Sequence, residues 1–121
     1  APADLFKHLR EMEKEEQRFG LIVLDPPALA KDGDNAGAAL RGYRELNLRA
    51  LRLLQPGGLL LTCSCTGVVH EGPFADAVQS AAIDAPASVR VLQRLGAGHD
   101  HPSLLGSPET RYLKCLLLRK D

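Results

Sequence analysis

Short, nearly continuous apolar runs divide the chain and predict four β-strands. Residues 21–24 and 59–62 are such runs, which are typical of strands with both faces buried. Residues 89–95 alternate loosely between apolar and polar side chains, and residues 112–118 are again mostly apolar. Each of these two segments is therefore also expected to form a strand.

Three longer segments between these runs carry apolar residues at helical spacing. The first covers residues 4–18, with Asp4 as its expected N-cap. The second covers residues 40–54 and is expected to stop at Pro56-Gly57-Gly58. The third begins near Pro73, since proline suits the first turn of a helix. The side chains expected to face the core include Met12, Tyr43, Leu46, Leu53, Phe74 and Val78.

The order of these elements predicts an α/β fold. Alternating helices and strands favour a mostly parallel sheet with right-handed crossovers. The last two strands are separated by a long loop without a helix, so we expect them to form an antiparallel pair. A length of 121 residues suits one domain. We therefore predict a single domain over residues 1–121.

Composition and charge exclude several classes of function. The chain has 15 basic and 15 acidic residues, so it lacks the strongly basic surface of a free-standing nucleic-acid binder. Its apolar runs are too short to span a membrane, and its start does not resemble a signal peptide. Three cysteines are an odd number, and we expect them to be free thiols in the cytoplasm.

Polar groups that can carry chemistry follow two of the predicted strands. Asp25-Pro26-Pro27 comes directly after residues 21–24, and Cys63 and Cys65 follow the start of the next run. Ligands bind at the carboxyl ends of strands in open α/β sheets, so a carboxylate and a thiol are expected to share one site. Cys63 and Cys65 would point to the same face of a strand, and spacing alone leaves the reactive thiol open.

The remaining candidates have weaker signals. His99-Asp100-His101 has no spaced Cys or His partners, whereas zinc sites need three or four ligands, so no metal is expected. Cys115 lies inside an apolar strand and is predicted to be a core residue.

Several motifs together resemble a known family, the class I S-adenosylmethionine-dependent methyltransferases. The chain resembles their C-terminal half, and most of all that of the bacterial 23S ribosomal RNA 5-methylcytosine methyltransferases. The motifs are Leu24-Asp25-Pro26-Pro27, Arg41-Gly42-Tyr43, Glu45-Leu46-Asn47, Pro56-Gly57-Gly58, Ser64-Cys65-Thr66-Gly67, Asp100-His101-Pro102 and Tyr112-Leu113-Lys114. The resemblance implies the second half of a Rossmann-like sheet. The family's glycine-rich cofactor loop and its small RNA-binding domain have no counterpart in these residues.

The resemblance also implies roles for two residues in catalysis. Cys65 matches the nucleophile that adds to carbon 6 of cytosine, so that carbon 5 can accept a methyl group. Asp25 matches the residue that hydrogen-bonds the edge of the base. Each also has a purely structural alternative: Cys65 as a small buried residue, and Asp25 as part of a strand-end turn. Ala28 stands where related enzymes carry a second cysteine, so no second catalytic thiol is expected there.

Further residues are implied in binding. Asp4 would contact the cofactor S-adenosylmethionine, together with Asp25, Pro26 and Pro27. Lys31, Arg41 and Tyr43 would contact ribosomal RNA. Each also has a structural alternative: Asp4 as a helix cap, Lys31 as a solvated loop charge, and Tyr43 as helix packing.

Two other functions and one assembly state stay open at this point. One alternative is a methyltransferase acting on uracil carbon 5, which would also use a thiol after a strand, or on a guanine nitrogen, which would need no covalent thiol. A non-catalytic α/β module that binds a partner is a third interpretation. Half of a doubly wound sheet leaves an apolar face uncovered, so we also expect a homodimer.

Overall fold

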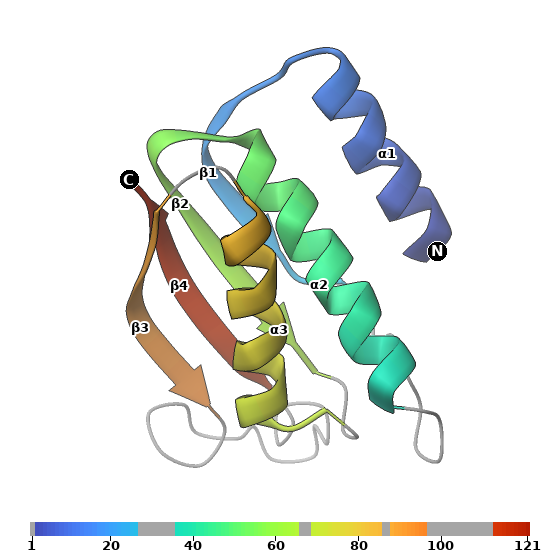
Figure 1. Ribbon diagram of the computed structural model, residues 1–121, viewed down its shortest axis with the longest axis vertical. Helices are drawn as coiled ribbons and strands as arrows, with labels where there is room; N and C mark the ends of the chain where they lie inside the picture. Colours follow the sequence, from blue (N-terminus) through green and yellow to red (C-terminus); the bar gives the residue numbers. More distant parts are fainter. Residues whose placement is uncertain (1, 27–35, 66–68, 86–87, 97–112) are drawn as a thin grey trace, which may run out of the picture.

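The computed structural model describes residues 2–26, 36–65, 69–85, 88–96 and 113–121. The chain forms helices and strands in the predicted order (Figure 1). They are α1 (Pro2–Lys14), β1 (Phe19–Leu24), α2 (Ala36–Leu53), β2 (Leu54–Ser64), α3 (Glu71–Asp84), β3 (Val89–Gly96) and β4 (Lys114–Lys120). None of the helices in these residues is long and apolar enough to cross a membrane.

The strands form one mixed sheet in the order β1-β2-β4-β3. β1 and β2 are parallel, whereas β4 is antiparallel to both of its neighbours. It follows that β1, β2 and β3 all run in one direction and that β4 alone is reversed. The predicted α/β fold, with an antiparallel strand pair at the end of the chain, is confirmed.

All three helices lie on one side of the sheet (Figure 1). α2 contacts β1 and β2, α3 packs along α2, and α1 packs on the outer side of α2. The core lies between α2, α3 and the inner face of the sheet, where Leu60 and its neighbour Leu118 are fully buried. Tyr43 and Phe74 meet there edge to face, with ring centroids 5.5 Å apart. The predicted inward faces of α2 and α3 are therefore confirmed.

The outer face of the sheet is apolar and only partly covered. Val23, Leu61 and Leu117 form a row across three strands. Val23 is 61% exposed, and Leu21 on the same strand is 62% exposed. The prediction that residues 21–24 are buried on both faces is wrong, because the described helices cover only one face.

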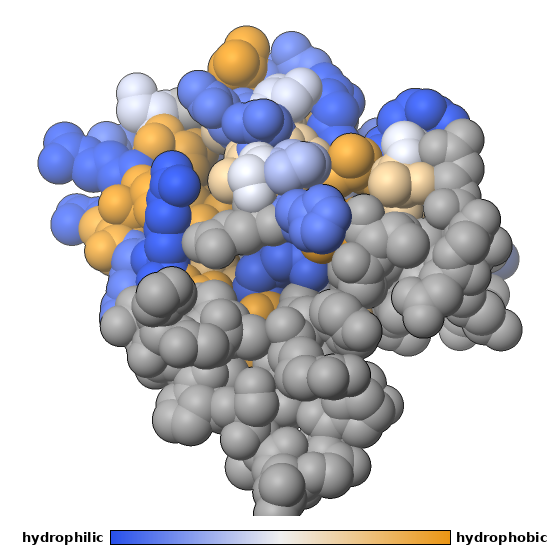
Figure 2. Space-filling model, turned by 90° about the horizontal axis from the view of Figure 1, so that it is seen from below, coloured by the Kyte–Doolittle hydropathy of each residue, from blue (hydrophilic) through white to orange (hydrophobic). Residues whose placement is uncertain are grey.

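The two edges of the sheet differ in character. β3 carries Arg90 and Arg94 beside the exposed Val91 and Leu92, and its pairing with β4 is irregular after Val91. Figure 2 shows this mixture of hydrophilic and hydrophobic residues on the side where β3 lies. Charges and irregular pairing are the usual protection of an edge strand. β1 has neither a charged residue nor a proline, although its pairing with β2 is also irregular, between Phe19 and Leu21. Its outer edge is therefore less protected than that of β3.

Several predicted boundaries are corrected. α1 begins at Pro2, so Asp4 lies inside the first turn rather than at the N-cap. α1 ends at Lys14, four residues early, and Glu16 then adopts a positive φ of 57°. α2 starts at Ala36, and β2 follows it directly through Pro56 and Gly57 instead of starting at residue 59.

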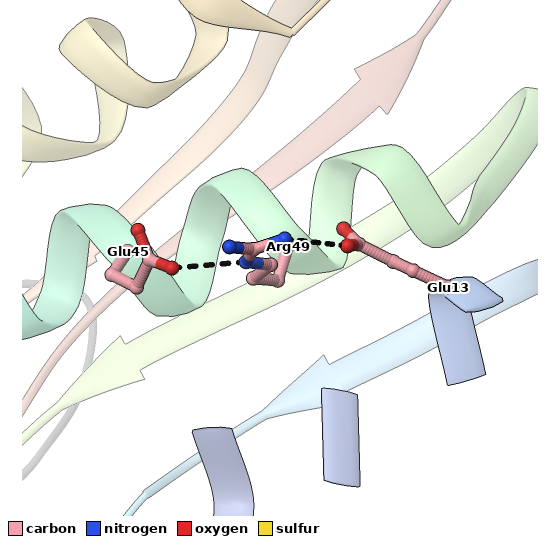
Figure 3. Close-up of polar contacts among 3 residues, drawn as sticks. All are labelled: Glu13, Glu45 and Arg49. Atoms are coloured by element: carbon pink, nitrogen blue, oxygen red, sulfur yellow. Dashed lines mark hydrogen bonds and ion pairs between the residues drawn. The ribbon is translucent and has the colours of Figure 1, made fainter. Parts of the chain in front are cut away.

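Arg49 ties α1 to α2 (Figure 3). Its guanidinium donates to Glu13 at 2.6 Å and to Glu45 at 2.9 Å. The hydrogen bond that Arg49 donates to Glu13 is the main reason that the pKa of Arg49 is raised, although burial opposes it. All three side chains are partly buried, so the pair is screened less than a surface pair. The contact links α1 to α2, beside the apolar packing of Leu9 and Met12 in the core.

Replacing Phe74 with alanine should destabilise the protein strongly. The ring is fully buried against Tyr43, and removing such a ring leaves a cavity that costs about 3–5 kcal/mol. Urea unfolding followed by circular dichroism would measure this. Ile83→Ala on the same helix is the matched control, because Ile83 is 76% exposed and should cost less than about 0.5 kcal/mol. Equal losses in the two variants would contradict the packing described above.

Candidate active site at the carboxyl edge of the sheet

Three segments meet at the edge where β1 and β2 end. Asp25 follows β1, Cys65 follows β2, and β4 begins here with Lys114 because it runs in the opposite direction. The register fixes their neighbours: Leu24 pairs with Thr62, and Ser64 pairs with Lys114. The predicted meeting of a carboxylate and a thiol at one edge of the sheet is thus observed.

Asp25 and Cys65 lie on the same side of this edge. Thr62 pairs with Leu24 and faces the helices, so Cys63 alternates to the outer face. The same alternation, continued one residue past the end of each strand, puts Asp25 and Cys65 on that face too. The electrostatics agree, since the charges of both Asp25 and Cys65 act on the Cys63 thiol. Asp25 is exposed, Cys65 is half-buried, and Cys63 is only 6% exposed. Of these two thiols, Cys65 is therefore the more accessible.

Cys63 is held in its protonated form by its surroundings. It pairs across the sheet with Cys115, and its hydrogen bond to the Cys115 sulfur is the main cause of its raised pKa. Burial and the negative charge of Asp25 raise that pKa further. A thiol must lose its proton before it attacks, so Cys63 is poorly suited to be a nucleophile. Its predicted role as an apolar filler agrees with this burial, and Cys115 is buried as predicted.

Lys114 is a charged group at this edge for which no role was predicted from the sequence. It is 6% exposed, and its positive charge helps to lower the pKa of Cys115, although the hydrogen bond from Cys63 is the larger cause. The motif Tyr112-Leu113-Lys114 contained the signal. β4 runs in the opposite direction to β2 and β3, so a lysine at its start lies at the edge where those two strands end.

The other predicted site residues are placed as follows. Pro26 is buried beside the exposed Asp25, and Arg41 is exposed on α2. The backbone of Asp4 lies in the first turn of α1, and its side chain is not among the side chains that the structure describes. Pro27, Lys31 and the segment 99–101 also fall outside the described residues.

Tyr43 is the predicted site residue that the structure places elsewhere. Its side chain has no exposed surface and packs on Phe74. An aromatic ring in the core cannot stack on a base in this conformation, so its predicted contact with RNA is corrected to core packing. Sequence periodicity had left this structural alternative open.

No three acidic, His or Cys side chains among residues 2–26, 36–65, 69–85, 88–96 and 113–121 are grouped so that they could hold a metal ion. This includes the three cysteines and Asp25. Within the part of the chain that the structure describes, this edge carries the half-buried Cys65 thiol, the exposed Asp25 carboxylate and the buried Lys114 ammonium group.

Comparison with solved structures identifies the fold. The chain superimposes on the SMU.776 protein in complex with SAH with a TM-score of 0.69, at 16% identity, over 94% of this chain and 29% of that one. A methyltransferase homolog protein from Pyrococcus horikoshii gives a TM-score of 0.57, at 19% identity, over 92% and 42%. The chain has part of the class I methyltransferase fold. The carboxyl edge that carries Asp25 and Cys65 is the ligand-binding edge expected of such an α/β sheet.

Sequence relatives narrow the comparison to one group of methyltransferases. Ribosomal RNA large subunit methyltransferase I of Shewanella frigidimarina is 43% identical over 117 residues, which are 97% of this chain and 30% of the relative. The protein of the same name from Aeromonas salmonicida is 42% identical over 116 residues, 96% of this chain and 29% of the relative. No protein-family model matches. The chain thus spans under a third of the methyltransferases that it resembles.

Proposed function

We propose that this chain is the C-terminal part of an S-adenosylmethionine-dependent enzyme that methylates carbon 5 of cytosine in ribosomal RNA. The observation that carries the proposal is the accessible Cys65 thiol on the same side of the sheet edge as the Asp25 carboxylate. The similarity to ribosomal RNA large subunit methyltransferase I supports the RNA substrate. Bacterial ribosomal RNA lies in the cytoplasm, where free thiols persist.

The chemistry explains why a thiol is needed. Carbon 5 of cytosine is a weak nucleophile, and addition of the Cys65 thiolate to carbon 6 makes the ring electron-rich at carbon 5. After methylation a base removes the proton from carbon 5, and the bond between sulfur and carbon 6 breaks. The target base must first leave its stack to reach a sheet edge of this kind.

The proposal assigns separate tasks to the residues around the thiol. Asp25 hydrogen-bonds the cytosine edge and favours protonation of the ring during attack. Pro26 fixes the backbone next to that carboxylate, since its φ is locked. Arg41, exposed at the start of α2, and Lys31 would contact phosphates.

S-adenosylmethionine would supply the activated methyl group. An exposed carboxylate beside a buried proline fits a positively charged ligand, and Asp4, Asp25, Pro26 and Pro27 are the residues proposed to contact it. These residues offer few polar contacts for so large a molecule. We infer that the larger part of its site belongs to the region that the relatives have and this chain does not span.

The isolated chain should accordingly bind the cofactor weakly and catalyse nothing. Isothermal titration calorimetry with S-adenosylmethionine should give a dissociation constant above about 1 mM, near the weak end of specific binding. Binding in the micromolar range would contradict the partial-site proposal. Asp25→Asn in the same experiment shows whether any residual binding uses the proposed carboxylate.

The isolated chain should also self-associate through its uncovered surface. Val23, Leu61 and Leu117 form an apolar row, and the edge of β1 carries no charge or proline. Both leave apolar area and backbone groups for a second copy to cover. Light scattering should give at least the mass of a dimer. Val23→Lys should shift the mass towards the monomer, whereas Leu92→Lys on the protected β3 edge should not. A monomer without any substitution would contradict this proposal.

A hybrid enzyme tests the function itself. This chain replaces the matching 30% of the Shewanella frigidimarina relative, and the hybrid is incubated with S-adenosylmethionine and ribosomal RNA that lacks the modification. Mass spectrometry of the nucleosides should show 5-methylcytidine. 5-Methyluridine or a methylated guanosine would support the alternative methyltransferases, and no methylated nucleoside beside an active parent enzyme would favour a non-catalytic module.

A further inference from the structure

The Cys63 and Cys115 thiols form a second reactive group, which the proposed reaction does not use. They lie directly opposite each other on the antiparallel strands β2 and β4. Residues in this relation have Cα atoms about 4.5–5.5 Å apart, and disulfides form at Cα separations of about 4.4–6.8 Å. The register alone therefore brings the two residues within bonding range.

The side chains also point at one another. Both project from the outer face of the sheet, both are less than 10% exposed, and the Cys63 thiol donates a hydrogen bond to the Cys115 sulfur. Their Cβ atoms are expected to lie about 4.5–5.5 Å apart, compared with about 3.8 Å in a disulfide. Bond formation thus needs only a small closure of the two strands.

The environment gives the two sulfurs different reactivities. Lys114, next to Cys115 on β4, favours its thiolate, whereas Asp25 opposes ionisation of both thiols. The hydrogen bond from Cys63 dominates and lowers the pKa of Cys115. Cys115 is therefore the sulfur that reacts first, and Cys63 holds the proton that is released in the second step.

We propose that Cys63 and Cys115 form an oxidisable dithiol, which peroxide converts to a cross-strand disulfide at the carboxyl edge of the sheet. The Cys115 thiolate attacks one peroxide oxygen, the O–O bond breaks, and a sulfenic acid and hydroxide form. The Cys63 sulfur then attacks the sulfenic sulfur, and hydroxide leaves with the thiol proton as water. Two thiols are oxidised to one disulfide, and the peroxide is reduced to water.

The Cys65→Ser chain is the main test, because Cys63 and Cys115 are then its only thiols. Treatment with hydrogen peroxide should remove two hydrogens from the intact mass, and dithiothreitol should restore them. Peptide mapping should join Cys63 to Cys115 within one chain. The bond closes a long loop and should raise the melting temperature by roughly 5 °C or more.

Two further chains serve as controls. Cys115→Ser and Cys115→Ala each keep Cys63 and Cys65, and peroxide should form no intramolecular disulfide in either at the same dose. Circular dichroism identifies any variant that has lost its fold, and the second substitution covers failure of the first. A disulfide between Cys63 and Cys65 in the Cys115 variants would overturn the proposal. So would dimers linked through sulfur, or irreversible oxygen addition, in Cys65→Ser.

Discussion

Replacing Cys65 with alanine should abolish covalent trapping of an RNA that carries 5-fluorocytosine in the hybrid enzyme. Fluorine at carbon 5 cannot be removed as a proton, so the adduct between sulfur and carbon 6 persists after methylation. Without the Cys65 sulfur no such bond forms, and methylation of ordinary RNA should fall by about 10³-fold or more. A denaturing gel with labelled RNA would show the trapped complex or its loss.

Cys63→Ala is the matched control for this experiment. Cys63 lies two residues away, but it is buried, and its hydrogen bond to the Cys115 sulfur keeps it protonated. The variant should still form the trapped complex. If Cys63→Ala loses trapping and Cys65→Ala keeps it, the nucleophile is assigned to the wrong residue.

Replacing Asp25 with asparagine should lower the rate of methyl transfer by about 10²–10⁴-fold, the usual range for a group that assists proton transfer. Asparagine preserves the size of the side chain but loses the negative charge that is proposed to favour protonation of the cytosine ring. Single-turnover methylation by the hybrid enzyme, with RNA binding measured separately, would locate the loss in the chemical step.

Asp76→Asn tests whether any loss of negative charge has the same effect. Asp76 is exposed on α3 and carries no proposed task, so its substitution should leave the rate within about twofold of the parent. A full rate in Asp25→Asn would remove Asp25 from the mechanism. A loss that came only from weaker folding would appear as a lower melting temperature, which the proposed role does not require.

The helix faces and the site edge could be predicted from the sequence because they depend on local patterns. Helical spacing placed Tyr43, Leu46 and Phe74 in the core, and each is fully buried. Asp25 and Cys65 each follow an apolar run, and parallel strands bring such positions to one edge. No long-range information was needed beyond the order of the elements.

The environment of the strands could not be predicted in the same way. Val23 is as apolar as a core residue, but its exposure depends on whether anything covers the outer face of the sheet. Whether Cys63 and Cys115 lie opposite each other depends on the register between two strands that are far apart in the sequence. The contact of Lys114 with the site follows only once β4 is known to run against β2.

The position of β4 has a consequence for how the protein is made. β2 and β3 are both synthesised before it, yet in the sheet each is hydrogen-bonded to β4 and not to the other. Until residues 114–120 have left the ribosome, the two strands remain separate, with open backbone groups facing the gap. The sheet therefore closes only after β4 has been made, and the open strands are exposed to misfolding or to chaperones until then.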